Sequence, residues 1–269
     1  MTRQDFGTDI ALNISADVAE IVIASPDGLN GYTTENMAQF EQAIRTASLS
    51  DAKLVAIRAE GKNFSIGASA DLLVTLREMP RDERERFILE GQNIVRAIRE
   101  SRKIVVAYIN GFAAGGGFDL MLACDVVLVG PKAKLNLFYS RLALLPDHGA
   151  LFFLDQRIAQ GAGSRELAEN RTHRGEKCIE AQLADAFVEE CPVSDWAEIV
   201  EETKGLPLSS LAALKVVWRA EYSDQFERHL AGVATAQSEI VATPLVVERV
   251  DRVRSLQMAR PLVPAEADS

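Results

Sequence analysis

The chain has 269 residues, of which 48% are hydrophobic, and it carries a formal net charge of −10 at pH 7. This length and apolar content allow one substantial core, and the acidic balance argues against a sequence-independent nucleic-acid binder, which needs a basic surface. Residues 1–9 lack an apolar run, and no segment is long and apolar enough to span a bilayer, so we expect a cytoplasmic protein without membrane contacts.

The cysteines and histidines predict neither a disulfide framework nor a metal site. Cys124, Cys178 and Cys191 are an odd number without close pairing, and none of them forms a C-x-x-C motif. Only three histidines are present, so the sequence offers no convincing cluster of metal ligands. We therefore expect neither a metal nor a bound cofactor.

Strand and helix patterns alternate through the first two-thirds of the chain. Residues 10–23 predict two short strands separated by a polar turn, because residues 18–23 alternate as a half-buried strand does. Thr34 is placed to cap a helix over residues 35–46. The pattern then predicts a strand at 54–58, a loop at 60–65, a helical stripe within 80–102, a strand at 104–109, a loop at 110–117, a short helix at 118–124 and a strand at 126–129.

Helical patterns dominate from residue 147 onward. Residues 209–219 and 223–254 predict two amphipathic helices, and the polar, proline-bearing tail at 261–269 is expected to be mobile. Interleaved strands and helices followed by helices predict an α/β fold. We expect a core over residues 1–200, with residues 201–269 as a helical C-terminal region of the same domain.

Two glycine-rich segments each follow a predicted strand and precede a predicted helix. In residues 63–71, Gly67 frees the backbone just before a helix that starts near Ser69, where unpaired N–H groups can point at an anion. In residues 109–119, three consecutive glycines at 115–117 let a ligand approach the backbone closely. Each segment alone is equally compatible with tight packing. A phosphate loop fits poorly, because no GK[ST] follows.

Taken together, the two segments resemble the signatures of the crotonase superfamily, which contains the enoyl-CoA hydratases and isomerases. FSIGASA at 64–70 is similar to the family's F-[SC]-A-G-A-D-L, and NGFAAGGGFDL at 110–120 is similar to its N-G-x-A-x-G-G-G-x-E-L, followed here by Cys124–Asp125. LNGYT at 29–33 and LLPDHG at 144–149 resemble two further family segments. Order and spacing match over roughly residues 18 to 190.

The resemblance implies a spiral core of repeated ββα units and C-terminal helices that form a homotrimer, often paired into a hexamer. It implies an acyl-CoA thioester as substrate and partner, bound without a further cofactor. The backbone N–H groups of Ala68 and Gly116 would form the oxyanion hole, where one preorganised donor is worth about 2.7–4 kcal/mol to an enolate-like transition state. The neighbouring positions would bind substrate: Ser65, Ile66, Gly67, Gly115, Gly117 and Asp71. Asp71 lies two positions after Ser69, which holds the place of the family's usual aspartate.

The resemblance is weaker where the family places its acid and base. Hydratases of the family use two glutamates, and this chain has Asp119 and Tyr139 at those positions. Asp119 keeps a carboxylate with a shorter reach. Tyr139 is a poor base at neutral pH, because the ordinary pKa of a phenol is about 10, although its hydroxyl could orient the acyl group. A plain hydratase that relies on Asp119 is therefore only an alternative.

Asp147, after Pro146, offers a replacement. Isomerases of phenylacetate breakdown carry a similar P-D-x-G segment with a proton-shuttling aspartate, and the 4-chlorobenzoyl-CoA dehalogenases place a nucleophilic aspartate nearby. One carboxylate suffices to move a double bond. We therefore predict an enoyl-CoA isomerase with Asp147 as the proton shuttle. The alternatives are a Pro-Asp turn with no catalytic role, a hydrolase or lyase of a thioester, a β-diketone or a halide that uses Asp147 or His148, and a non-catalytic scaffold.

Overall fold

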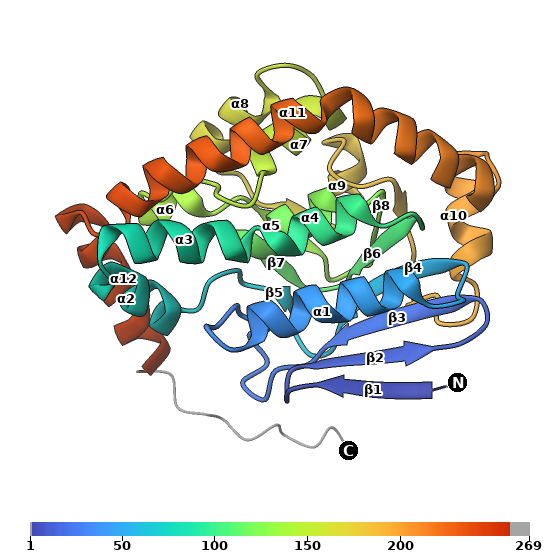
Figure 1. Cartoon of the computed structure of the whole chain (residues 1–269), viewed down its shortest axis with the longest axis horizontal. Coiled ribbons are helices and arrows are strands. Elements are labelled where there is room, and N and C mark those ends of the chain that lie inside the picture. The colour runs from blue at the N-terminus through green and yellow to red at the C-terminus, as the bar shows by residue number, and fades with distance from the viewer. Residues whose placement is uncertain (1, 259–269) are drawn as a thin grey trace.

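The strands form two sheets, as Figure 1 shows for this computed structural model, which describes residues 2–258. The seven-stranded sheet has the order β1-β2-β3-β4-β6-β8-β11, and the four-stranded sheet has the order β10-β9-β7-β5. The larger sheet contains β1 (Thr2–Phe6), β2 (Ile10–Ile14), β3 (Val18–Ile23), β4 (Leu54–Ala59), β6 (Val105–Ile109), β8 (Val126–Val129) and β11 (Ala186–Phe187). The smaller sheet contains β5 (Asn63–Ser65), β7 (Phe112–Ala114), β9 (Lys134–Asn136) and β10 (His173–Arg174).

The expected ββα repeat is present. β4, β6 and β8 run parallel in the larger sheet, and the strand that follows each of them runs parallel in the smaller sheet. The helices that complete the repeats and the C-terminal region are α1 (Asn36–Leu49), α2 (Ala70–Glu78), α3 (Arg81–Gly91), α4 (Asn93–Glu100), α5 (Gly116–Ala123), α6 (Tyr139–Leu142), α7 (Ala150–Arg157), α8 (Ala162–Glu169), α9 (Lys177–Glu180), α10 (Trp196–Lys204), α11 (Leu208–Ile240) and α12 (Pro244–Met258).

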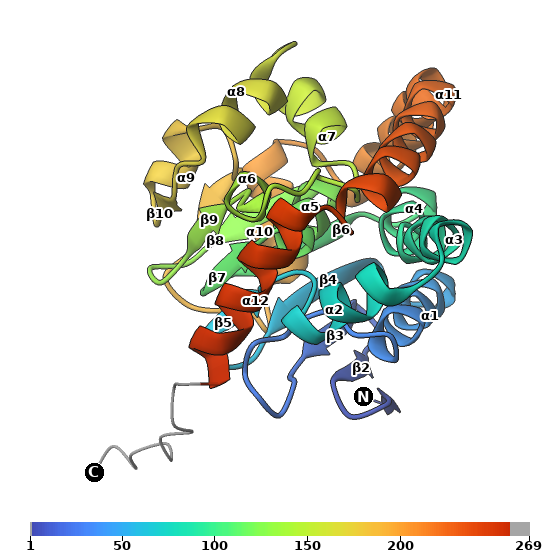
Figure 2. The ribbon, with the colours of Figure 1, turned by 90° about the vertical axis from the view of Figure 1, so that its left-hand side faces the viewer.

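Helices α11 and α12 pack onto the core that the repeats build. Figures 1 and 2 show α11 crossing the molecule beside α3 and α4, while α12 turns back along α2. Phe226 and Leu230 from α11 and Val250 from α12 are buried in the same apolar cluster as the strands. The C-terminal helices therefore share a core with the first 200 residues, and α10 crosses the expected boundary at residue 200.

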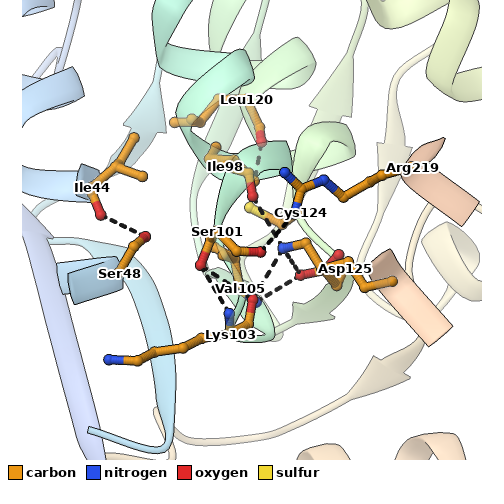
Figure 3. Close-up of polar contacts among 11 residues, drawn as sticks. Ile44, Ser48, Ile98, Ser101, Lys103, Val105, Leu120, Cys124, Asp125 and Arg219 are labelled. Carbon is orange, nitrogen blue, oxygen red and sulfur yellow. Dashed lines mark hydrogen bonds and ion pairs between the residues drawn. The ribbon is translucent and has the colours of Figure 1, made fainter. Parts of the chain in front are cut away.

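An ion pair between the buried Lys215 of α11 and the part-buried Asp125 links α11 to the sheet. Figure 3 shows Asp125 with its neighbours Ile98, Lys103 and Val105. The ammonium group of Lys215 lies 2.6 Å from Asp125 Oδ2 and donates to the carbonyls of Ile98 and Lys103, both at 3.0 Å. The same carboxylate oxygen accepts the N–H of Val105 at 2.7 Å. Because removing one partner of a buried pair leaves an uncompensated charge, this contact fixes α11 against the end of α4 and the first residues of β6 and β8.

Several elements differ from the sequence prediction. β5 and β7 lie in segments predicted as loops, because strands of three residues are too short to show a periodic pattern and depend on pairing with each other. The predicted stripe at 80–102 is divided into α3 and α4 around Gln92. The capping hydroxyl at α1 belongs to Thr33, which accepts the N–H of Asn36 at 3.1 Å, and not to Thr34.

The C-terminal helices also differ from the prediction. α11 continues through residues 219–223, and its Ser223 and Asp224, which resemble a helix start, lie within it. The break falls instead before Pro244, which begins α12, as expected for a residue without an N–H to donate. Residues 261–269 lie outside the described residues. No single described helix is long and apolar enough to cross a membrane; only α11 and α12 together, across their 82° bend, reach that length and composition.

Candidate active site

The two glycine segments lie in backbone contact. Gly67 has a φ of +75°, and a Cβ placed on it would lie 2.4 Å from the backbone nitrogen of Gly116. A Cβ on Gly117 would lie 2.4 Å from the carbonyl oxygen of Ser65. Both distances are far below van der Waals contact, so only glycine permits the two segments to approach this closely.

Two backbone N–H groups at this contact are free of secondary-structure bonds. Gly116 begins α5, so its N–H has no acceptor within the helix. Tyr32 forms a parallel bridge with Ala68, in which the carbonyl of Gly67 accepts at 2.7 Å and the N–H of Ser69 donates at 3.0 Å. The Ala68 N–H is therefore outside the bridge. Neighbouring N–H groups without such bonds are what an oxyanion hole requires, so Ala68 and Gly116 stay the candidates for it.

Tyr32 joins the two segments and was not predicted as a site residue. Its hydroxyl donates to the carbonyl of Gly116 at 3.1 Å, and its ring lies where a Gly116 side chain would point. Tyr32 is 4% exposed. The segment LNGYT marked this turn in the sequence, but it gave no indication that the Tyr32 hydroxyl would form a hydrogen bond with Gly116.

An apolar cavity of about 60 Å³ lies beside Ala68 and Gly116, between the glycine segments, α2 and α3. Its other lining residues are Tyr32, Met37, Ile66, Leu72, Leu73, Leu76, Phe87, Ile88, Gly115, Phe138, Tyr139, Leu142, Leu144, Asp147, His148 and Gln237. Among the described residues that line it, Asp147 is the one carboxylate. A second apolar cavity, of about 170 Å³, shares Ile66 and Ala68 and extends to Val250 and Val253 on α12.

The predicted substrate-binding residues differ in their access to the cavity. Ile66 and Gly115 line it. Ser65 is fully buried and does not line the cavity; its hydroxyl oxygen accepts the N–H of Gly67 at 3.1 Å and so stabilises the glycine turn. Asp71 lies on the outer face of α2 with its side chain 76% exposed, 2.9 Å from Arg254 of α12. The carboxylate of Asp71 is therefore directed away from the cavity.

Asp119 is a fully buried carboxylate on the first turn of α5. Its Oδ2 accepts the backbone N–H groups of His148 at 3.0 Å and Ala150 at 3.4 Å, while Oδ1 has no partner among the described residues. Burial raises the pKa of Asp119 to about 7; Asp147 adds to this rise, and His148 and the two N–H groups oppose it. Asp119 is thus placed to hold the 147–150 backbone, and it does not line the cavity.

Asp147 and His148 form a buried side-chain pair. Asp147 Oδ1 lies 2.9 Å from His148 Nδ1, and the His148 ring lies 5.8 Å from the ring of Tyr32. Burial alone would lower the pKa of His148, but the carboxylates of Asp147 and Asp119 outweigh it and raise that pKa. The two carboxylates therefore stabilise the protonated form of the His148 ring by more than burial disfavours it.

Polar atoms without partners gather around this pair. Within the described residues, Tyr139 OH, His148 Nε2 and Asp119 Oδ1 are buried and have no hydrogen-bond partner. Burial raises the pKa of Tyr139 well above 10, so the phenol stays protonated and is a donor rather than a base. A buried polar group without a partner is costly. Within residues 2–258, no three His, Cys, Asp or Glu side chains could hold a metal ion.

Two glutamines hold the loop that carries Asp147, and sequence reasoning missed both. Gln92 Nε2 donates to the Asp147 carbonyl at 2.8 Å, and Gln237 Oε1 accepts the Leu145 N–H at 3.0 Å. The available signal was a polar residue within an apolar helical stripe. Such a residue is equally common on a solvated face, so the sequence did not single these two out.

Comparison with known proteins places the chain in a single sequence family. The sequence model described as enoyl-CoA hydratase/isomerase matches residues 13–250. The chain is 24% identical over 226 residues to YhaR of Bacillus subtilis, which is named as an enoyl-CoA hydratase/isomerase, covering 84% of this chain and 88% of that protein. It is 28% identical over 215 residues to EchA14 of Mycobacterium tuberculosis, named as an enoyl-CoA hydratase, covering 80% of this chain and 82% of that protein.

Solved structures agree on the fold. A crystal structure of an enoyl-CoA hydratase/isomerase from Mycobacterium paratuberculosis superposes with a TM-score of 0.82 at 21% identity, covering 93% of this chain and 100% of that one. At this identity the likeness establishes the spiral ββα fold. The reaction must be argued from the side chains around the cavity.

Proposed function

The chain belongs to the enoyl-CoA hydratase/isomerase family, and we propose that this member moves the double bond of an enoyl-CoA thioester with Asp147 as the proton shuttle. The observation that carries the proposal is the position of Asp147. It is the carboxylate that lines the cavity beside Ala68 and Gly116, within the described residues. A single carboxylate beside an oxyanion hole matches the needs of isomerisation.

The reaction balances without any other reactant. Asp147 removes a proton from C2 of a 3-enoyl thioester, and the electrons of that C–H bond spread onto the thioester oxygen. The N–H groups of Ala68 and Gly116 stabilise this oxygen in the dienolate. Asp147 then returns the proton to C4, which leaves a double bond between C2 and C3 and restores the carboxylate.

His148 and Tyr139 assist as donors in this proposal. The bond between His148 Nδ1 and Asp147 Oδ1 orients the carboxylate and leaves Oδ2 for the substrate. Tyr139 remains protonated because its pKa is raised by burial. Its unpartnered hydroxyl could therefore donate to the substrate but not remove a proton from it.

The arrangement is less suited to hydration. Adding water across a double bond calls for a base for the water and an acid for the carbon, a pair that the family's hydratases provide with two glutamates. Here Tyr139 cannot replace the second, and Asp119 is held by the N–H groups of His148 and Ala150. A hydratase with Asp119 as its base would need that carboxylate to reach a cavity that it does not line.

Hydrolysis is a second candidate, favoured by the bond between Asp147 and His148. A histidine that is oriented by an aspartate is a common base for activating water, and His148 Nε2 has no partner among the described residues. Mass spectrometry after reaction in ¹⁸O-labelled water distinguishes the two. A hydrolysed thioester or β-diketone carries the label in its new carboxylate, whereas an isomerised enoyl-CoA carries none.

We also propose a homotrimer or a hexamer built on the C-terminal helices. α11 exposes Val216, Val217 and Trp218, which are 48%, 62% and 58% exposed, on consecutive positions. Exposed apolar side chains that adjoin one another are a feature of contact sites between proteins. Analytical ultracentrifugation of the whole chain tests this; a monomer at micromolar concentration contradicts it.

The test of the reaction is Asp147→Asn, with Asp119→Asn as the matched control. We expect Asp147→Asn to lower the isomerisation rate of 3-enoyl-CoA by about 10²–10⁴-fold while thioester binding stays within a few-fold. Asp119→Asn keeps an oxygen for the two N–H groups and should retain most of the activity. Equal rates for wild type and Asp147→Asn, or a larger loss in Asp119→Asn, contradict the proposal.

A further inference from the structure

The peptide between Asp147 and His148 is held at both of its polar ends. The carbonyl of Asp147 accepts a hydrogen bond from Gln92 Nε2 at 2.8 Å. The N–H of His148 donates to Asp119 Oδ2 at 3.0 Å. The Cα atoms of Asp147 and His148 flank this planar peptide, so a rotation of the peptide would turn both side chains. The two hydrogen bonds prevent that rotation.

The amide of Gln92 is itself fixed on all sides. Gln92 is fully buried between α3 and α4. Its Nε2 donates a second bond, at 2.9 Å, to the carbonyl of Leu230 in α11, and its Oε1 accepts from Arg96 at 3.3 Å. A buried carboxamide with donors and acceptor satisfied in this way has one favourable orientation. Gln92 therefore transmits the position of α11 and α4 to the Asp147 carbonyl.

Helix α11 supports the same loop at two further points. Gln237 Oε1 accepts the N–H of Leu145 at 3.0 Å, two residues before Asp147. Gly149, with a φ of +97°, lies against the side chains of Phe226 and Leu230, where an added Cβ would meet them at 3.3 and 3.5 Å. The loop from 145 to 149 thus lies directly on α11.

We propose that Gln92, aided by Gln237, is a positioning residue that sets the orientation of the Asp147–His148 pair by fixing the peptide between them to α11. Gln92 does not touch the cavity, so it acts only through Asp147. The inference rests on the proposed function for its kinetic consequences. The geometry of the Asp147–His148 pair, however, can be measured without any substrate.

The experiment compares Gln92→Met, a near-isosteric change without donors, with Asn30→Leu as matched control. Asn30 is also buried and also donates from its carboxamide to two backbone carbonyls, those of Glu60 and Asn63, away from the Asp147 loop. Gln92→Met loses three side-chain hydrogen bonds, two donated and one accepted from Arg96. Asn30→Leu loses four, two donated and two accepted from Ser25, and also places a leucine at a φ of +53°. A purely structural effect would therefore be at least as large in Asn30→Leu, whereas a positioning effect on the Asp147–His148 pair would be confined to Gln92→Met.

The first readout is NMR titration of the ring of His148, one of only three histidines in the chain. Asp147 and Asp119 raise the pKa of His148 against the effects of burial and of Arg96. If Gln92→Met loosens the pair, that pKa should fall by about 1 unit, and it should be unchanged in Asn30→Leu. The second readout is isomerisation, where we expect kcat to fall about 10-fold or more with KM within about 3-fold.

An unchanged His148 titration in folded Gln92→Met, or equal kinetic losses in the two variants, overturns the proposal. Should Gln92→Met not fold, Gln237→Met removes the second contact of the loop and should shift the His148 titration in the same direction; no shift would also overturn it. A wild-type protein that does not isomerise enoyl-CoA contradicts the proposed function alone. In that case the histidine titration still decides whether Gln92 positions the pair.

Discussion

The two halves of the site are built by different means. Ala68 and Gly116 offer backbone N–H groups, and their place depends on glycines that let two short segments touch. Asp147 and His148 offer side chains, and their place depends on Gln92, Gln237 and other residues distant in the sequence. Backbone geometry stays the same when most side chains change. We therefore expect the first half to carry the features common to the family and the second half to carry the proposed chemistry of this chain.

The largest expected effect comes from disturbing the backbone half. In Gly67→Ala, a Cβ would lie 2.4 Å from the Gly116 nitrogen, so both donors must move. We expect isomerisation kcat/KM to fall by about 10³-fold, the upper value for losing one such donor. The control is Gly205→Ala at φ +67°, where nothing lies within 4 Å; it should cost about 1–2 kcal/mol of stability and no activity. Equal activity in the two variants would contradict the assignment of the oxyanion hole.

The next effect concerns the carboxylate that joins the two halves. Burial raises the pKa of Asp119 from 3.8 to about 7, so between these values the folded protein holds a proton that the unfolded chain has released. The contribution of Asp119 to the free energy of unfolding is therefore greatest below about pH 4 and is lost as the pH rises toward 7. The difference amounts to about 4 kcal/mol at most.

Asp119→Asn cannot titrate and removes this dependence. Urea unfolding of both proteins between pH 4.5 and 8 checks the prediction. The free energy of unfolding of the wild type should fall relative to that of Asp119→Asn as the pH rises. Parallel curves would mean that Asp119 is not the carboxylate whose pKa burial raises.

The smallest expected effect is a difference in stability when the hydroxyl of one or the other of two buried tyrosines is removed. Tyr139 OH makes no hydrogen bond of normal geometry among the described residues, although it lies close enough to Asp119 for that carboxylate to help raise its pKa. Tyr32 OH, in contrast, donates to Gly116. Tyr139→Phe should therefore raise the free energy of unfolding by about 1 kcal/mol, and Tyr32→Phe should lower it by about as much. Thermal unfolding of the free proteins measures both. A destabilised Tyr139→Phe would show that its hydroxyl has a partner in the folded protein.

The comparison also explains how much could be read from the sequence. The glycine segments, β4, β6 and β8 were predicted, because local patterns and short motifs specify them. Asp147 and His148 were named as candidates from the segment LLPDHG, and the structure brings them together at the cavity. The assignment of their roles stays a prediction.

The features that were missed depend on contacts between distant segments. Gln92 and Gln237 act on a loop 55 and 92 residues away in the chain, and no periodicity indicates such a bond. The sequence predicted two helices, at 209–219 and 223–254, where the structure has one continuous α11; Ser223 and Asp224, which are typical of a helix start, lie inside it. In the folded chain the packing of Phe226 and Leu230 in the core outweighs that local preference.

The most direct test follows one hydrogen through the reaction. A 3-enoyl-CoA labelled with deuterium at C2 is converted in ordinary water, and the product is analysed by NMR and mass spectrometry. The account predicts 2-enoyl-CoA with part of the label at C4, because Asp147 carries it between the two carbons, and no such product from Asp147→Asn. A 3-hydroxyacyl-CoA product, or label transfer that persists in Asp147→Asn, would contradict it.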